Sequence, residues 1–255
     1  MNKIFKYIVS DILRNKIMIF YTIFLLIASF SVFNLEDTSS KGILSMLSIM
    51  LLIVPLVSII FSTIYVYNST EFIELLLSQP IKRKTVWLSL FGGLAGSLSL
   101  AFIFGAGIIT LIFEPSFKGL LLVLLGVFLS VIFSSIAMLA AVSTRDKAKG
   151  MGSSILLWLY FSVLFDGLFL FAIFQFSDYP IEKYMVGLSM LNPIDLSRIL
   201  LLMQFDVSAL MGYSGAIFRD YFGTTLGMII STGAMILWII APLYFSLRKF
   251  KSKDL

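Results

Sequence analysis

Six long apolar runs constrain what this 255-residue chain can fold into more than any other feature. A helix needs about 20 residues to cross the hydrocarbon core of a bilayer, and each run is long enough to do so. Backbone polar groups inside lipid must be paired within their own segment, so runs of this kind predict helices. The sequence therefore predicts an all-α, polytopic membrane protein with a single transmembrane domain over 1–255. The six spans are expected near 17–35, 43–67, 86–113, 119–142, 153–176 and 224–247.

Lysine and arginine are distributed unevenly between the two sides that these spans define. If the N-terminus lies in the cytoplasm, fourteen of the 19 basic residues fall in inner segments and five in outer segments. By the positive-inside rule, this predicts a membrane protein with both termini in the cytoplasm. The net charge of +5 is then explained by topology. Membrane lipids are expected around the chain, and no nucleic-acid partner is expected.

The sequence contains no cysteine and no histidine. Disulfides, thiolate catalysis, His-based zinc sites and Ser–His hydrolysis are thereby excluded. Methionine is left as a soft ligand for Cu(I). The weak candidates, all in the outer segment, are Met185, Met190, Met203 and Met211. They form no tight cluster and methionine packs well in irregular cores, so we expect no metal to bind directly.

Nucleotide chemistry is also missing from the sequence. The motif G-x-x-x-x-G-K-[ST], which cradles the phosphates of ATP, does not occur. An intramembrane metalloprotease of the H-E-x-x-H type is excluded by the lack of histidine. We therefore expect no catalytic residue and no directly bound cofactor, and any ATP must be used by a partner subunit.

Residues 1–16 predict an amphipathic helix that lies in the inner interface before the first span. One face carries Ile4, Phe5, Ile8, Ile12 and Leu13. A cleavable signal peptide is the alternative. It is disfavoured because apolar residues interrupt the basic segment and the first span is longer than an h-region.

Small residues recur every four positions in two of the predicted spans. The two rows are Gly93, Ser97, Ala101 and Gly105, and Gly223, Gly227 and Ser231. Such rows let helix backbones approach closely in lipid. Packing within one subunit is favoured over a dimer interface, and both interpretations stay open.

The inner stretch 68–85 reads NSTEFIELLLSQPIKRKT. Ser69 or Thr70 is expected to cap a short helix, which Pro80 then ends. This helix is too short to span a membrane, so its apolar face must be buried in lipid or in a partner. The alternative is an inward extension of the second span. The candidate partner-contacting residues are Glu71, Phe72, Glu74, Leu75, Leu76, Leu77 and Pro80.

Asp166 stands near the middle of the predicted fifth span. A carboxylate at the bilayer centre costs about 2.5–3.5 kcal/mol on insertion scales, so it is rarely left facing lipid. A hydrogen-bonded lock, with Ser162 or a neighbouring helix, is slightly favoured over a group that titrates during a conformational cycle. Its protonation state is left open.

The outer segment 177–222 contains a second short amphipathic helix. Asn192 is expected at its N-cap and Pro193 at its first helical position. Asp195 and Arg198 are spaced to pair at i, i+3. These four residues are the candidates for contact with an extracytoplasmic partner, and a purely packing role is equally open.

The motif E-x-x-E-L-L-L-S-Q-P and the basic cluster after it resemble the coupling-helix region of type-2 ATP-binding-cassette (ABC) permeases. The form usual there is close to G-T-L-E-L-L-L-T-x-P, and this chain departs from it at Glu71 and Phe72. The resemblance implies that this helix docks into a separate cytoplasmic ATPase.

Two further motifs narrow the resemblance. An F-D-x-L-x-L run over Phe165–Leu170 and an L-N-P-x-D-x-x-R element over Leu191–Arg198 resemble the NosY-type permeases. That resemblance implies a homodimer that works with NosF-type ATPases and a periplasmic NosD-type β-helical protein. Such complexes supply copper to nitrous oxide reductase in denitrification, and ATP is used by the partner ATPase. The alternative is a general type-2 exporter of a lipid, drug or peptide.

Overall fold

The computed structural model describes residues 2–175, 182–205 and 224–252. All regular structure in these residues is helical, and six helices are long and apolar enough to cross a membrane. The predicted all-α, polytopic fold is therefore confirmed. The six spans are Lys16–Leu35, Ser39–Asn68, Arg83–Phe113, Phe117–Ser143, Lys147–Ala172 and Leu226–Ser252.

Internal contacts divide the chain into two compact units. Unit 1 comprises Met1–Leu156 and Ile239–Leu255, and unit 2 comprises Leu157–Trp238. The boundaries fall inside two long helices, α8 and α13. The two units are described separately below.

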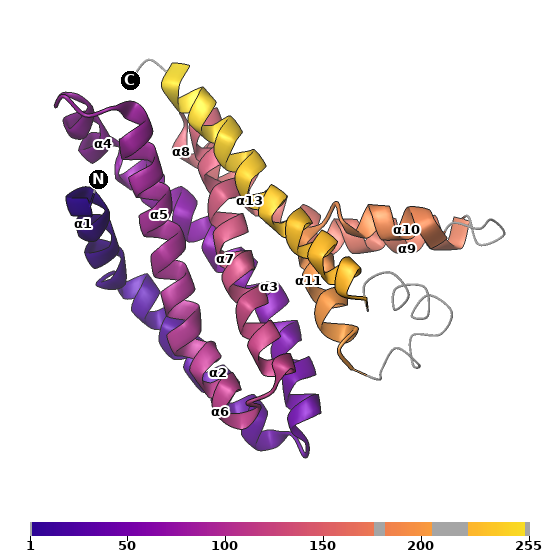
Figure 1. Ribbon diagram of the computed structural model, residues 1–255. Helices are drawn as coiled ribbons and strands as arrows, with labels where there is room; N and C mark the ends of the chain where they lie inside the picture. The colour runs from indigo at the N-terminus through magenta and orange to yellow at the C-terminus, as the bar shows by residue number, and fades with distance from the viewer. Residues whose placement is uncertain (1, 176–181, 206–223, 253–255) are drawn as a thin grey trace. The chain divides into compact units, whose positions relative to one another are not determined.

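Unit 1 contains most of the spans. Its elements are α1 (Asn2–Leu13), α2 (Lys16–Leu35), α3 (Ser39–Asn68), α4 (Thr70–Leu77), α5 (Arg83–Phe102), η1 (Ile103–Gly107), α6 (Ile108–Phe113), α7 (Phe117–Ser143), the start of α8 (Lys147–Leu159) and the end of α13 (Thr225–Ser252). Helices α3 and α7 pack along each other, and α5 packs on α7 and on α1. Figure 1 shows α1, α4 and the end of α13 at one end of this unit, with the α2–α3 and α6–α7 turns at the opposite end.

Hydroxyl groups link the helices in the core of unit 1. Ser62 of α3 donates to Ser134 of α7 at 3.3 Å. The hydroxyls of Thr63 and Ser154, on α3 and α8, are hydrogen bonded at 2.7 Å. Interhelical bonds of this kind help hold helices together in lipid, where the hydrophobic effect does not drive helices to associate.

The small-residue row of the third span packs against other helices of the same chain. A Cβ at Gly93 would clash with Ile8 of α1, and one at Gly105 would lie 2.9 Å from the carbonyl oxygen of Thr22 on α2. The favoured interpretation, packing within one subunit, is confirmed for these two glycines. In the second row, Gly227 and Ser231 are buried, and Gly223 lies outside the described residues.

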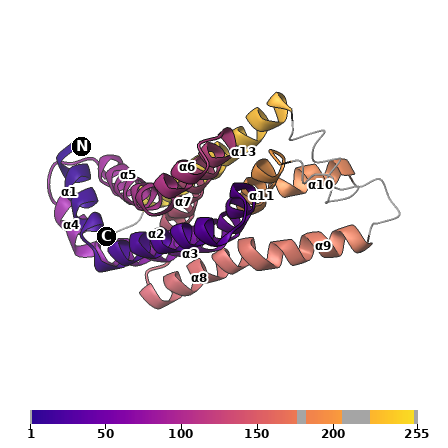
Figure 2. The same cartoon turned by 90° about the horizontal axis from the view of Figure 1, so that it is seen from below.

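The N-terminal amphipathic helix is present as α1, but its buried face is narrower than predicted. Ile8 and Ile12 are buried, whereas Phe5 and Leu13 are exposed. Ile8 and Ile12 lie four residues apart on one face, and Leu13 lies about 100° further round the helix. The face covers α5, and α1 also contacts α4 through Tyr7 and Phe72, whose stacked rings have centroids 5.4 Å apart. Figure 2 shows α4 beside α1.

Unit 2 contains η2 (Tyr160–Leu164), α9 (Phe165–Gln175), α10 (Glu182–Ser189), α11 (Pro193–Leu202) and the start of α13. Trp238 of α13 holds this unit together. Its indole Nε1 donates to the carbonyl oxygen of Met190 at 3.1 Å. Its ring also meets Phe161 of η2 edge to face, with 5.3 Å between centroids.

Candidate functional site

The predicted short inner helix is α4 (Thr70–Leu77), which is separated from α3 by one residue, Ser69. Ser69 holds the N-cap position but makes no side-chain capping bond. The hydroxyl of Thr70 donates instead to the carbonyl oxygen of Tyr67. The predicted side-chain cap is therefore wrong. Ser69 also serves as the C-cap of α3, and its φ of −91° and ψ of 9° are not the extended geometry that a capping hydroxyl needs.

Helix α4 has one buried side chain, and its other side chains are half-buried or exposed. Ile73 is 4% exposed, whereas Leu75 is 67% exposed. The carboxylate-bearing Glu71 and Glu74 are exposed as well. Ser78 forms the C-cap, and Pro80 follows two residues later. The outward face thus combines an apolar centre with acidic residues, a composition that suits a protein partner.

A groove of about 320 Å³ lies behind α4. Its lining comprises Val66, Tyr67, Thr70, Ile73, Glu74, Trp87, Ala141, Val142, Arg145 and Phe250. The groove therefore lies among α4, the start of α5 and the ends of α3, α7 and α13.

The start of α5 is clamped to the end of α13. Trp87 Nε1 donates to Ser246 Oγ at 2.7 Å, and the Trp87 ring stacks on Phe250 with 4.1 Å between centroids. Arg83 Nη1 donates to the carbonyl oxygen of Lys251 at 3.2 Å. A guanidinium at the carbonyl end of a helix is favoured by the helix dipole. Sequence reasoning missed this clamp, because nothing local to residues 82–87 indicates which remote helix end they meet.

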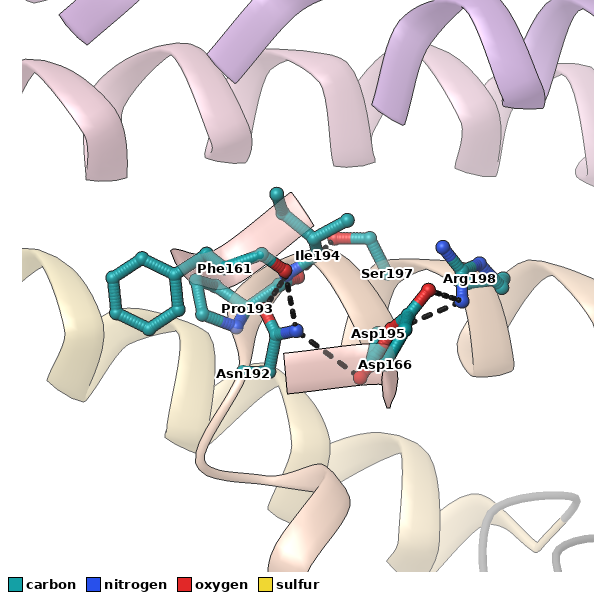
Figure 3. A network of polar contacts seen from close by, with 8 residues as sticks. All are labelled: Phe161, Asp166, Asn192, Pro193, Ile194, Asp195, Ser197 and Arg198. Atoms are coloured by element: carbon teal, nitrogen blue, oxygen red, sulfur yellow. Dashed lines mark hydrogen bonds and ion pairs between the residues drawn. The ribbon is translucent and has the colours of Figure 1, made fainter. Parts of the chain in front are cut away.

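At the N-terminus of α11, the side chain of Asn192 makes three hydrogen bonds (Figure 3). Its Oδ1 accepts from the backbone N–H of Ile194 at 3.0 Å, which confirms the predicted cap, with Pro193 at the first helical position. Its Nδ2 donates to the carbonyl oxygen of Phe161 at 2.8 Å and to Asp195 Oδ2 at 3.1 Å. Phe161 lies in the π-helix η2, a conformation found often at functional sites. Asn192 therefore ties α11 to the irregular turn of the fifth span.

Arg198 joins two carboxylates. Its Nη1 lies 2.9 Å from Asp166 Oδ2 and 3.1 Å from Asp195 Oδ1, so the predicted i, i+3 pair is present. Ser162, suggested as a partner of Asp166, donates instead to the carbonyl oxygen of Trp158. We call Asp166, Asn192, Asp195 and Arg198 the outer network.

The helix that carries Asp166 begins at Lys147, six residues before the predicted start of the fifth span, and continues through η2 into α9, which ends at Gln175. Asp166 is the second residue of α9, and Arg198 of α11 reaches it there. A cationic partner from outside the spans thus offsets much of the cost of this carboxyl group.

Two carboxyl groups share one guanidinium in the outer network, and this sets its electrostatics. Asp195 is 7% exposed. Burial raises its pKa to about 7, and its hydrogen bond with Asp166 and the negative charge of Asp166 act in the same direction. Arg198 and Asn192 lower the pKa without cancelling these effects. The network can therefore take up or release a proton near neutral pH.

The amino-acid sequence matches the family described as ABC-2 family transporter protein over residues 4–255. The chain belongs to this family. It is also similar to the probable ABC transporter permease protein NosY of Pseudomonas aeruginosa strain PAO1. The two are 28% identical over 183 residues, which cover 66% of this chain and 66% of that relative.

Family membership fixes the coarse function. This ABC-2 permease is an integral membrane subunit of an ABC transporter. The resemblance to NosY-type permeases inferred from the sequence is supported by the similarity to NosY.

The methionine candidates of the permease do not come together as one described site. Met203 is buried and Met190 is half-buried, with its carbonyl oxygen bound by Trp238. Met185 lies in α10 with its side chain outside the description, and Met211 lies outside the described residues.

Proposed function

We propose that this ABC-2 permease couples ATP hydrolysis by a cytoplasmic NosF-type ATPase to a conformational change in a periplasmic NosD-type β-helical protein. In this proposal the partner, and not the permease, handles copper for nitrous oxide reductase. Two permease copies act together in the bacterial inner membrane, with both termini and α4 in the cytoplasm. ATP is the partner's substrate, and the permease binds no cofactor.

The observation that carries the proposal is the outer network. The two motifs specific to the NosY-type resemblance, Phe165–Leu170 and Leu191–Arg198, are separated along the chain and joined by the contact of Asp166 with Arg198. A displacement of the fifth span would therefore be passed directly to α11. The similarity to NosY supports the same assignment.

The other end of the proposed relay is α4. Exposed Leu75 and half-buried Leu76 and Leu77 would enter a cleft of the ATPase, and Glu71, Phe72, Glu74 and Pro80 would flank that contact. The groove behind α4 gives the helix room to move when the ATPase pushes on it. The contact of Phe72 with Tyr7 links the same movement to α1.

Gentle-detergent purification of the tagged permease from its native host, followed by mass spectrometry, tests the proposal. We expect an ATPase and a periplasmic β-helical protein to follow it. An Arg198→Gln variant is expected to lose the periplasmic protein and keep the ATPase, and the retained ATPase shows that the variant is folded.

Recovery of the ATPase alone, with intact membranes and crosslinking controls, would contradict the periplasmic relay. The chain would then be a general type-2 exporter, whose ATPase activity in vesicles a lipid, drug or peptide should stimulate. Stoichiometric, methionine-dependent Cu(I) binding by the isolated permease would contradict the assignment of copper to the partner.

A further inference from the structure

A second groove, of about 350 Å³, runs between α2 and the end of α5. Its lining comprises Leu13, Met18, Ile19, Thr22, Ile23, Leu100, Ala101 and Phe104. Ile19, Ile23 and Phe104 are large apolar side chains that stay exposed in the folded chain. All three belong to membrane-crossing helices, so the medium at the open side of the groove is hydrocarbon.

The small residue Ala101 lines the α5 side of the groove. Ala101 is buried, and Gly105, one turn further, lets α2 approach closely enough that Ser29 Oγ donates to its carbonyl oxygen at 3.2 Å. The α2 wall of the groove runs from Met18 to Ile23, five residues or about 7.5 Å at the rise of a helix. Leu13 of α1 extends the wall beyond the elbow. An apolar slot that opens to hydrocarbon suits a flexible acyl chain.

One end of the groove is strongly basic. Leu13 and Met18 line it, and between them the elbow of α1 and α2 carries Arg14 and Lys16, both exposed. Neither takes part in the three ion pairs found among the described residues. The nearby carboxylate of Asp11 accepts a hydrogen bond from Tyr65 of α3 at 2.9 Å.

The start of α2 adds to the positive potential of this elbow. Asn15 caps the helix by accepting from the N–H of Ile17 at 2.9 Å, and the first turn contains no acidic residue. The dipole of a 20-residue helix therefore points its positive end at the same place as the two cationic side chains. Backbone amides and basic side chains together favour a phosphate group.

We propose that this groove binds a phospholipid with an anionic headgroup. One acyl chain occupies the slot between α2 and α5, and the headgroup phosphate lies against Arg14, Lys16 and the start of α2. The lipid would fix the angle between α1 and α2, and α1 in turn contacts α4 through Tyr7 and Phe72. The site is independent of copper and of any periplasmic partner. In the proposed topology it faces the cytoplasmic leaflet, which carries anionic lipids.

Native mass spectrometry of the full-length permease released from nanodiscs tests this site. The nanodiscs contain phosphatidylglycerol or phosphatidylcholine with identical acyl chains. Wild type is expected to retain phosphatidylglycerol preferentially. The double variant Arg14→Gln/Lys16→Gln should lower that retention about 30-fold, since each basic residue at an anionic surface contributes about fivefold.

Matched variants separate the two halves of the site. Lys82→Gln/Lys84→Gln removes the same charge from exposed residues of the inner loop and should change nothing. Thr22→Phe fills the slot and should reduce retention of both lipids, whereas Ile27→Phe, an exposed residue of the same helix outside the groove, should not.

Three results would overturn the proposal. Equal retention of the two lipids by wild type would contradict the proposed contact with the anionic headgroup. An equal loss in the Lys82/Lys84 control would reduce the effect to nonspecific charge. A Thr22→Phe variant that dissociates permease dimers and still binds lipid would make the groove a contact between copies. Since Arg14 and Lys16 are both exposed, their variant should fold and keeps the test decisive even if Thr22→Phe does not.

Discussion

Helix α4 and the outer network differ in how their side chains are satisfied. Helix α4 leaves apolar Leu75 exposed and has Ile73 as its buried side chain, with a groove at its back. The outer network buries Asn192 and Asp195 and pairs them with each other and with Arg198. The first has an unsatisfied surface, and the second is complete within the chain.

This difference indicates that α4 is a docking surface for another protein and that the outer network is a structural contact within the chain. An exposed apolar helix gains stability only when another protein covers it, so changes there should affect partners more than folding. In a network of linked polar side chains, removing one member leaves the others without a hydrogen-bond or ion-pair partner. Changes in the outer network should therefore affect the folded state first.

The largest expected effect is on the docking surface. The variant Leu75→Asp/Leu76→Asp should lose the ATPase completely in co-purification and stay inserted in the membrane, because it places two charges in a desolvated contact. The control Leu35→Asp makes the same kind of change at an exposed leucine at the far end of α2 and should keep the ATPase. Retained co-purification by the double variant would mean that α4 is not the coupling helix.

Removing the shared cation of the outer network should destabilise the fold. Arg198→Met leaves Asp166 and Asp195 facing each other without a counter-charge. We expect a loss of about 2–3 kcal/mol, below the range for fully buried pairs because Arg198 and Asp166 are 38% and 33% exposed. In a thermal melt in detergent, Tm should fall by about 4–12 °C.

A compensating variant sharpens this test. Arg198→Met combined with Asp166→Asn and Asp195→Asn removes all three charges and should recover at least half of the lost Tm, since replacing a whole network costs less than breaking it. If the triple variant is no better than the single one, shape and not charge holds this region together.

How much of this could be read from the sequence differs between the two regions. The cap at Asn192 and the pairing of Asp195 with Arg198 follow from spacing within one helix, so both were predictable. The contact of Arg198 with Asp166 bridges 32 residues. To predict it from the sequence would have required knowing that the fifth span begins at Lys147 and includes the π-helix η2.

The same limit applies to the inner end of unit 1. The spans and α4 follow from apolar length and motif. The contact of Arg83 and Trp87 with the end of α13 depends on a helix about 160 residues away. The local sequence around Arg83 and Trp87 does not predict that contact. The missing capping bond of Ser69 also could not be predicted from the sequence. It depends on the single residue that separates α3 from α4.

A smaller effect should appear in the pH dependence of stability. The pKa of Asp195 rises from an ordinary 3.8 to about 7 on folding, so the folded state binds a proton that the unfolded state lacks between these values. Stability from this group is fully present below about pH 4 and is lost as pH rises through about 7. The slope is at most about 1.4 kcal/mol per pH unit.

Melting curves between pH 5 and 8 measure this slope. Wild type should lose up to about 3–6 °C per pH unit more than the Asp195→Asn variant does. The control Asp37→Asn alters an exposed acid paired with Lys41 and should leave the slope unchanged. Parallel curves for wild type and Asp195→Asn would show that Asp195 does not titrate in this range.

The smallest expected effect distinguishes a static joint from a moving one. Asp166→Asn keeps a hydrogen-bond acceptor for Arg198 and leaves Arg198 paired with Asp195, so it should cost about 1 kcal/mol, or 2–4 °C in Tm. Assembly and coupled ATPase activity should both persist if the contact is a structural lock. The control Ser162→Ala, one turn earlier with only an intrahelical bond, should change neither. An Asp166→Asn variant that assembles fully but loses coupled ATPase activity would instead place this carboxyl group in the conformational cycle. A purely structural contact can be weakened without loss of the coupled movement.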